Sequence, residues 1–116
     1  MQLKVVLVVV LLALVQLAAL HNNHNLAVGW RECGDRLLYR ERVQQKFKFL
    51  GTRTAYLHYP SLGISNSTIT YILALNESRG GYASVLGGGV GRTYVTLRFR
   101  SGFSRGIKFV VEIYGK

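Results

Sequence analysis

The sequence predicts an all-β fold, namely a small antiparallel β-sheet domain, built as a sandwich or as a rolled meander, that follows an N-terminal signal helix. From Thr54 onward the apolar runs are short, alternate with polar residues and end at glycine, serine or asparagine, which is typical of strands. No stretch of this region repeats its apolar residues with the period of a helix over a useful length.

The first 20 residues are predicted to be a signal peptide. Lys4 supplies a positive charge, and an unbroken apolar run follows it from Val5 to Val15. Even when it is counted through Leu20, the run falls short of the ~20 apolar residues that a membrane-spanning helix needs. We therefore expect no stable membrane anchor after cleavage, with a retained anchor as the alternative. Residues 21–116 are expected to form a single β domain, because their number suits one hydrophobic core.

The start of this domain holds few groups with specific chemistry. His21 and His24 could bind a metal ion weakly at a new N-terminus, but the asparagines beside them favour a polar chain end. No Cys/His group has the spacing of a zinc site, so we predict no metal site and no cofactor. Cys33 is the only cysteine and cannot form an internal disulfide. We expect a buried free thiol there, with a dimer linked through Cys33 as the alternative.

Residues 35–50 are compatible with one or two helical turns or with an extended sheet edge. Phe47 and Phe49 alternate with Lys46 and Lys48, which favours a strand by Lys46. Alternation of basic and aromatic residues can also bind nucleic acid, but a half-buried strand produces the same pattern more often.

Three strands are expected next, over residues 54–59, 67–75 and 81–86, each bounded by residues that favour turns. Two further strands, over residues 92–100 and 107–114, show the clearest alternation. Along 92–100 the odd positions are mostly apolar and the even positions polar, so one face turns toward a core and the other toward water.

The last two strands are expected to pair as a hairpin. Their apolar positions must share one face, which fixes the parity of the pairing. The two nearest registers place Lys108 opposite Arg98 or Arg100, and like charges that face each other repel. We interpret this group as a basic contact surface for an anionic partner. Its residues are Arg92, Arg98, Arg100 and Lys108, and the shared apolar face consists of Thr93, Val95, Leu97, Phe99, Ile107, Phe109, Val111 and Ile113.

Two short motifs suggest chemistry that their surroundings do not support. Gly102–Gly106 spells the G-x-S-x-G nucleophile elbow of hydrolases around Ser104, but a strand follows where a helix is needed, and no histidine lies downstream. The run 86–93 resembles a phosphate-binding loop, but Leu86 and Arg92 replace the first glycine and the lysine of that motif. We predict a hairpin loop at Ser104, no catalytic residue, and a structural glycine loop formed by Gly87, Gly88, Gly89 and Gly91.

The charge of the chain is strongly basic. Residues 21–116 carry 14 basic against 5 acidic residues, because Lys4 is the one basic residue of the leader. This excess makes an anionic partner plausible, whether a glycosaminoglycan, an anionic lipid, a nucleic acid or an acidic protein, and the alternative is a basic surface without a partner. No specific nucleic-acid motif is present: residues 105–112 partly match an RNA-recognition strand, but Ile107 and Glu112 replace two of its aromatic residues.

Two sequons, at Asn66 and Asn76, are predicted sites of N-glycosylation. They agree with passage through the secretory pathway, and chance occurrence of so short a pattern is the alternative.

A resemblance to a known family is carried by residues spread over 29–115: Gly29, Gly34–Leu37, Ile69–Ile72, Gly81–Val85, Gly88–Gly91, Val95–Leu97, Ser101, Gly106, Phe109 and Val111–Gly115. In these residues the chain resembles the insect family named after multiprotein bridging factor 2. The founding member of that family is described as a transcriptional co-activator that bridges a DNA-bound nuclear receptor to the general transcription machinery, and many relatives look like small secreted proteins of saliva, venom or haemolymph. The resemblance implies no catalytic residue.

Our leading hypothesis is therefore a secreted, extracellular, non-enzymatic β protein that acts through contacts with a protein or an anionic surface. A nuclear bridging factor is the second hypothesis, although no clustered run of lysine and arginine marks a nuclear-localisation signal. A cationic defence or venom protein is the third, and a hydrolase that uses Ser104 is the fourth.

Overall fold

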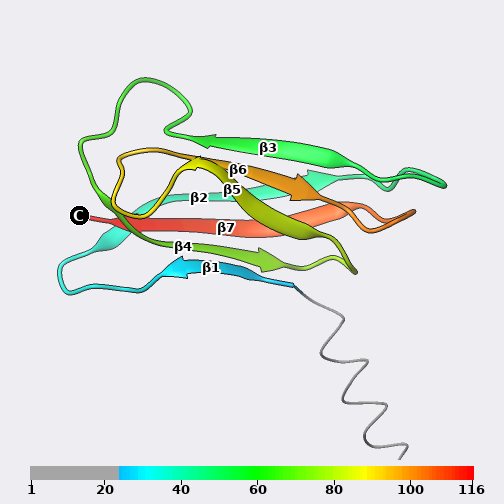
Figure 1. Cartoon of the computed structure of the whole chain (residues 1–116), viewed down its shortest axis with the longest axis horizontal. Coiled ribbons are helices and arrows are strands. Elements are labelled where there is room, and N and C mark those ends of the chain that lie inside the picture. Colours follow the sequence, from blue (N-terminus) through cyan, green and yellow to red (C-terminus); the bar gives the residue numbers. More distant parts are fainter. Residues whose placement is uncertain (1–23) are drawn as a thin grey trace, which may run out of the picture.

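The structure, a computed structural model, describes residues 24–116, and the predicted signal helix lies outside the described residues. Seven strands form two antiparallel sheets with the orders β1-β4-β7-β2 and β3-β6-β5, so the fold is the sandwich of the two predicted architectures (Figure 1). No helix occurs between residues 24 and 116. The strands are β1 (Leu26–Gly29), β2 (Arg36–Gln45), β3 (Thr54–Tyr59), β4 (Ile69–Asn76), β5 (Tyr82–Gly88), β6 (Val95–Arg100) and β7 (Ile107–Gly115).

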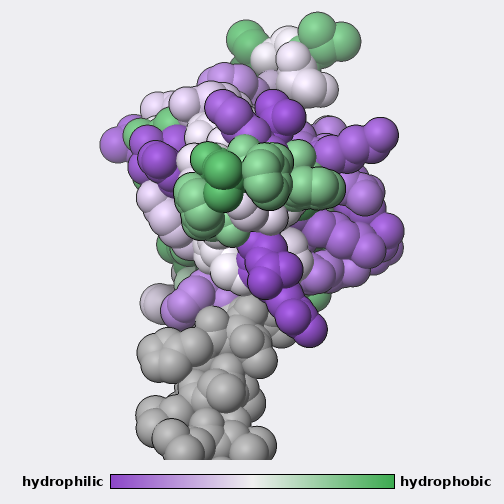
Figure 2. Space-filling view, turned by 90° about the vertical axis from the view of Figure 1, so that its right-hand side faces the viewer, coloured by the Kyte–Doolittle hydropathy of each residue, from purple (hydrophilic) through white to green (hydrophobic). Residues whose placement is uncertain are grey.

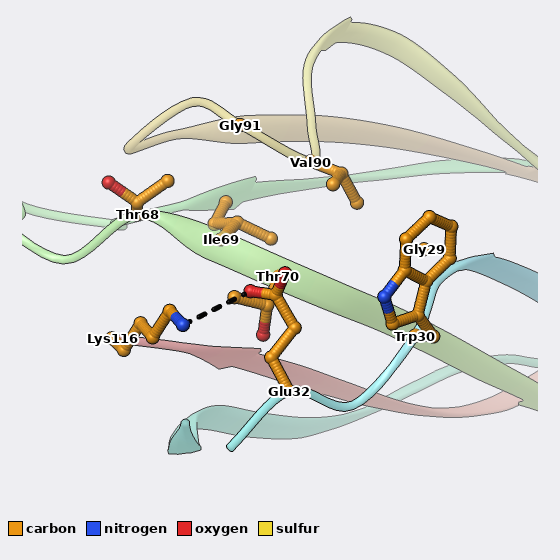
Figure 3. A pocket seen from close by; sticks show the side chains of 9 residues that line it. All are labelled: Gly29, Trp30, Glu32, Thr68, Ile69, Thr70, Val90, Gly91 and Lys116. Atoms are coloured by element: carbon orange, nitrogen blue, oxygen red, sulfur yellow. Dashed lines mark ion pairs between the residues drawn. The ribbon is translucent and has the colours of Figure 1, made fainter. Parts of the chain in front are cut away.

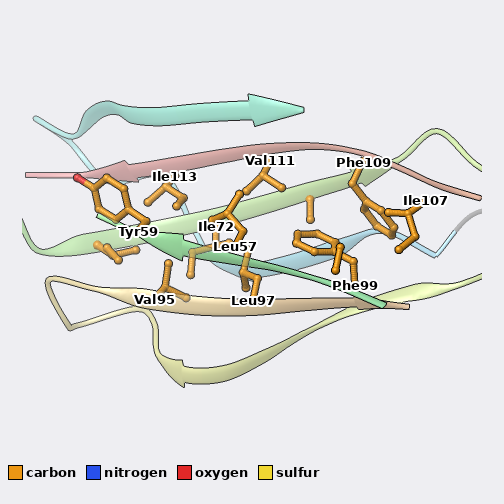
Figure 4. Packing of buried hydrophobic residues seen from close by; sticks show 13 residues of the cluster. Leu57, Tyr59, Ile72, Val95, Leu97, Phe99, Ile107, Phe109, Val111 and Ile113 are labelled. Atoms are coloured by element: carbon orange, nitrogen blue, oxygen red, sulfur yellow. The ribbon is translucent and has the colours of Figure 1, made fainter. Parts of the chain in front are cut away.

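The core lies between the two sheets (Figure 4). Alternate residues of each strand point inward, as the period of two requires, and the inner faces of β6 and β7 supply most of the largest buried side chains. The rings of Phe99 and Phe109 meet across the core with their centroids 5.0 Å apart. The fully buried large side chains are Phe99, Phe109, Ile69, Ile72, Leu97, Ile107, Ile113, Val95 and Val111.

The predicted C-terminal hairpin is wrong. β6 pairs with β3 and β5, whereas β7 pairs with β2 and β4 in the other sheet. The predicted apolar positions of both strands do face one core, but they meet it from opposite sides. A shared inward face does not distinguish neighbours in one sheet from strands in two packed sheets, and the loop 101–106 has enough residues to cross the ~10 Å between them.

The strand expected by Lys46 is also absent. Of the two alternatives for residues 35–50, the extended sheet edge is the one that forms, as β2 at the edge of its sheet. It ends at Gln45, however, and residues 46–53 form a loop. Gln45 pairs with Ile107, the first residue of β7, so the chain beyond Gln45 has no neighbouring strand to bond. Phe47 and Phe49 are consequently exposed, at 61% and 76%, and do not lie on a half-buried strand.

The remaining strand predictions differ from the structure only at their ends. The strand 54–59 has the predicted bounds, and the other four begin up to three residues later than expected or extend up to two residues further. β1 was not expected from the sequence. It has four residues and lies at the edge of its sheet beside β4.

Three loops meet at one end of the sandwich, which we call the loop end: residues 46–53, 77–81 and 101–106 (Figure 1, right). The backbone N–H of Leu50 donates to Ser104 Oγ at 2.8 Å, and the N–H of Ser104 donates to the Gly51 carbonyl at 2.7 Å. A Cβ on Gly102 would lie 3.3 Å from the carbonyl oxygen of Arg79, which places the third loop beside them. The loop end is therefore one connected surface.

Replacing Phe109 with alanine should lower the free energy of unfolding by about 3–5 kcal/mol, because a fully buried ring is lost and a cavity is left between the sheets. Urea unfolding followed by circular dichroism measures the change. Phe103→Ala is the matched control: its ring is 65% exposed, so a change within about 0.5 kcal/mol is expected. Equal losses in the two variants would contradict the described core.

Candidate functional site

The glycine loop lies at the end of the sandwich opposite the loop end, where it joins the two sheets. Gly88, Gly89 and Gly91 have positive φ, and a Cβ on Gly88 would collide with the Tyr94 carbonyl oxygen, so glycine is required there. The N–H of Gly91 donates to the Ile69 carbonyl at 2.9 Å. The loop is therefore hydrogen-bonded to the first residue of β4, and two of the four glycines that were expected to form it, Gly87 and Gly88, are the last residues of β5.

A pocket of about 260 Å³ lies beside this loop (Figure 3). Trp30 and Val90 border it with apolar side chains, and Lys116 Nζ lies 3.6 Å from Glu32 Oε2 on its polar side. Trp30 is 72% exposed. The pocket is thus shallow and mostly apolar, with one ion pair at its border.

The side chain of Asp35 anchors the segment that leads from β1 to β2. Its carboxylate is 1% exposed and accepts four contacts, of which two come from Arg31: Nε at 2.8 Å and Nη2 at 2.8 Å from Oδ1. The Glu32 N–H and the Thr70 hydroxyl donate to Oδ2 at 2.8 and 2.9 Å. The guanidinium of Arg31 also lies 3.9 Å above the ring of Tyr114. This network fixes two residues that line the pocket, Glu32 and Thr70.

Hydrogen bonds from Arg31, and also from the Glu32 N–H and the Thr70 hydroxyl, lower the pKa of Asp35 from 3.8 to about 2. Asp35 is the only aspartate in the chain. Its carboxyl group in the folded protein is therefore ionised at neutral and mildly acidic pH.

The predicted basic surface is distributed over separate faces. Arg98 and Arg100 lie on β6, where Arg98 is opposite Tyr56 and Ser84 of its own sheet. Lys108 pairs with Gln44 in the other sheet. Arg92 precedes β6 at the glycine-loop end. The four residues do not meet as a single cluster, because the hairpin that would have joined them is not formed.

The acidic side chains are mostly engaged with cations. Four carboxylates form ion pairs: Asp35 with Arg31, Glu112 with Arg40, Glu77 with Arg42 and Glu32 with Lys116. Glu41 accepts a hydrogen bond from Tyr39. Ten basic side chains of residues 24–116 consequently have no carboxylate partner among the described residues: Arg36, Lys46, Lys48, Arg53, Arg79, Arg92, Arg98, Arg100, Arg105 and Lys108.

The other predicted groups lie apart from one another. Cys33 is exposed in the turn before β2, so the expectation of a buried thiol is wrong. Ser104 lies in the loop between β6 and β7, where its hydroxyl accepts the Leu50 N–H and a strand follows it, as predicted. His58 is on β3, with its Nδ1 2.8 Å from Thr96 Oγ1.

The two sequons differ in accessibility. Asn66 is exposed in the long loop between β3 and β4. Asn76 is 4% exposed, and its Nδ2, the atom that would carry a glycan, donates to the Gly80 carbonyl at 3.0 Å. Its Oδ1 accepts the Ser78 N–H at 2.9 Å. A bulky sugar on Asn76 would have to displace this turn.

Two features are absent from residues 24–116. No group of three or more His, Cys, Asp and Glu side chains is arranged to hold a metal ion within those residues. Within the same range, no helix is long and apolar enough to span a membrane.

Comparison with known proteins gives two matches. Residues 28–115 match the protein family described as "Transcription activator MBF2", which covers all of the sandwich except the start of β1. A protein of Bombus ignitus named "Probable salivary secreted peptide" is 37% identical to this chain over 100 residues, which are 83% of this chain and 72% of that protein. No solved structure matches the chain.

The pKa of Asp35 predicts a specific acid dependence. The unfolded carboxyl has its ordinary pKa near 3.8, so the stability that the carboxylate contributes is complete above that pH and is lost as the pH falls through about 2. Asp35→Asn should be less stable than the parent at neutral pH and should lose this part of the acid dependence. Urea unfolding measured between about pH 5 and pH 2 tests both expectations.

Glu41→Gln is the control for that experiment, because it removes an exposed carboxylate and leaves the Asp35 network intact. It should keep the acid dependence of the parent. If Asp35→Asn and the parent lost stability in parallel over this pH range, the described network would be wrong.

In the secreted protein, glycosylation should occur at Asn66 and not at Asn76. Asn66→Gln should abolish the mobility shift that an N-glycosidase produces, because the acceptor is removed. Ser78→Ala, which destroys the second sequon and retains Asn76, should leave the shift unchanged. A smaller shift in Ser78→Ala would show that the buried amide is glycosylated before the turn closes.

Proposed function

The chain belongs to the family of the transcription activator MBF2, and on that premise we propose that it is a secreted, extracellular, non-enzymatic protein that binds an anionic partner through its surface. The name of the Bombus ignitus relative supports secretion, as do the leader-like residues 1–20 and the exposed sequon at Asn66.

The observation that carries the proposal is the unequal pairing of charges. Four of the five acidic residues are neutralised by ion pairs within the sandwich, so ten cations face solvent or partly exposed surface without a counter-charge in residues 24–116. Exposed cations repel one another, and a bound anion relieves this repulsion. They also attract anions from a distance, and added salt shortens that distance by screening the charges.

These cations are concentrated at the loop end. Five of the ten belong to its three loops, and Arg100 and Lys108 lie at the strand ends that adjoin them. Glu77 is the one acidic residue in those loops, and it lies 3.8 Å from Arg42. The five cations of the loops are Lys46, Lys48, Arg53, Arg79 and Arg105.

The family description favours a second function, namely transcription activation. A nuclear co-activator would keep its N-terminus and reside in the nucleus, and its cations could contact nucleic acid or an acidic protein. Location therefore separates the two functions.

The full chain should be exported when it is expressed in eukaryotic cells, and sequencing of the protein in the medium should find an N-terminus close to His21. The exported protein should bind immobilised heparin, a soluble polyanion, and should elute earlier as salt is added. Retention in the nucleus with an intact Met1 would overturn the proposal in favour of transcription activation.

Two double variants with the same change in net charge locate the binding surface. Arg53→Gln with Arg79→Gln removes unpaired cations of the loop end, whereas Arg40→Gln with Arg42→Gln removes cations that already have carboxylate partners. The first pair should weaken heparin binding more than the second. Equal weakening would mean that net charge alone, and no particular surface, governs binding.

A further inference from the structure

The loop end carries an unusual group of exposed apolar side chains, which we call the apolar tip. Phe47 is 61% exposed, Phe49 76%, Leu50 65% and Phe103 65%. Figure 2 looks onto this end and shows a hydrophobic group at its centre, with hydrophilic residues around it. Exposed apolar residues are normal when they are scattered singly, whereas a group of large ones at one place indicates a contact site.

The apolar tip is held in place by its backbone. Leu50 and Ser104 both have positive φ, at 53° and 55°, a conformation that residues other than glycine adopt at an energetic cost. Two hydrogen bonds between these loops, from the Leu50 N–H to Ser104 Oγ and from the Ser104 N–H to the Gly51 carbonyl, maintain it. The aromatic side chains of 47, 49 and 103 are therefore presented outward by a fixed scaffold.

Basic residues surround the apolar tip. Lys46 and Lys48 alternate with its two aromatic residues along one loop, and Arg105 follows Phe103 closely on another. All three cations lack a carboxylate partner among residues 24–116. Hydrophobic anchors and cations thus share one small convex surface.

We propose that the loop end docks on a phospholipid surface that carries anionic headgroups. Phe47, Phe49, Leu50 and Phe103 enter the boundary between headgroups and acyl chains, where aromatic rings are favoured, and the surrounding lysines and arginines contact the headgroups. The inference rests on the proposed function and names the anionic partner as a lipid bilayer.

A bilayer explains both halves of this surface. A soluble polyanion such as heparin or a nucleic acid backbone would satisfy the cations but would leave four apolar side chains largely in water. An anionic bilayer provides negative charge at its surface and an apolar layer directly below, so it offers a partner both for the cations and for the exposed apolar side chains. Both the charge and the apolar character of the loop end therefore match an anionic bilayer.

Co-sedimentation with vesicles tests the proposal, with the protein that cells secrete when they express the full chain. The protein should sediment with vesicles of phosphatidylcholine and phosphatidylserine in a roughly 2:1 ratio and should remain in solution with phosphatidylcholine alone. The triple variant Phe47→Ala, Phe49→Ala, Phe103→Ala should bind the anionic vesicles roughly tenfold more weakly, or more weakly still, because three inserted rings are lost.

Matched controls come from the opposite end of the sandwich. Leu62 and Ile64 are 90% and 91% exposed in the loop between β3 and β4, so Leu62→Ala with Ile64→Ala removes apolar surface away from the tip and should not change binding.

The cations of the tip are tested in the same way. Lys46→Gln with Lys48→Gln should weaken binding about tenfold or more. Arg36→Gln with Arg92→Gln, which has the same net charge, should weaken it much less.

A tryptophan in the tip reports insertion directly. Trp30 is the only tryptophan, so Trp30→Phe combined with Phe49→Trp places a single indole at the apolar tip. Its emission should shift to shorter wavelength on addition of anionic vesicles, and brominated acyl chains should quench it. Emission that stays unchanged, or vesicle binding by the triple alanine variant as tight as that of the parent, overturns the inference.

Heparin separates this failure from failure of the proposed function. If the parent binds heparin but no vesicles, the partner is a soluble or protein-bound polyanion and the secreted contact function stands. If the triple alanine variant binds vesicles as tightly as the parent, the apolar tip is not the docking site, and the secreted contact function again stands. If the protein is not secreted, or if it binds neither anion, the proposed function fails together with the inference.

Discussion

The whole architecture depends on one constraint, which is that β6 and β7 bury their apolar residues against each other from opposite sheets. The contact of Phe99 with Phe109 joins the two layers near the end of β6 and the start of β7. Because the chain must leave one sheet after Arg100 and enter the other at Ile107, the connecting loop is forced to the end of the sandwich. The same requirement brings residues 46–53 there, since β2 and β3 also belong to different sheets. The loop end and its chemistry follow from this change of layers.

Alternation of apolar and polar residues was sufficient to predict the strands from Thr54 onward, because a period of two defines one buried face whatever lies opposite it. It could not predict which sheet a strand joins, and the hairpin interpretation of β6 and β7 failed for that reason. It also misplaced Phe47 and Phe49, since the pattern of a half-buried strand is the same as that of a basic loop with protruding rings. Only the start of β7 at Ile107 shows that no partner strand remains beyond Gln45.

Part of the candidate site had no signal in the sequence. Asp35 and Thr70 are 35 positions apart, and nothing in the residue types around them indicates that one bonds the other. The pairing of the acidic residues was likewise hidden, although it decides which cations remain unpaired. Net charge could be counted from the sequence, whereas its division into neutralised and unpaired groups required the positions of Arg31, Arg40 and Arg42.

The composition of β2 has a consequence for how molecules of this protein meet one another. β2 is a ten-residue outer strand whose far side has free N–H and C=O groups, a surface onto which a strand of another copy could add. Arg36, Arg40, Glu41 and Arg42 place charged side chains along it. Charged side chains on an edge strand disfavour its pairing with another strand, so we expect this edge to resist the sheet extension that leads to fibrous aggregation.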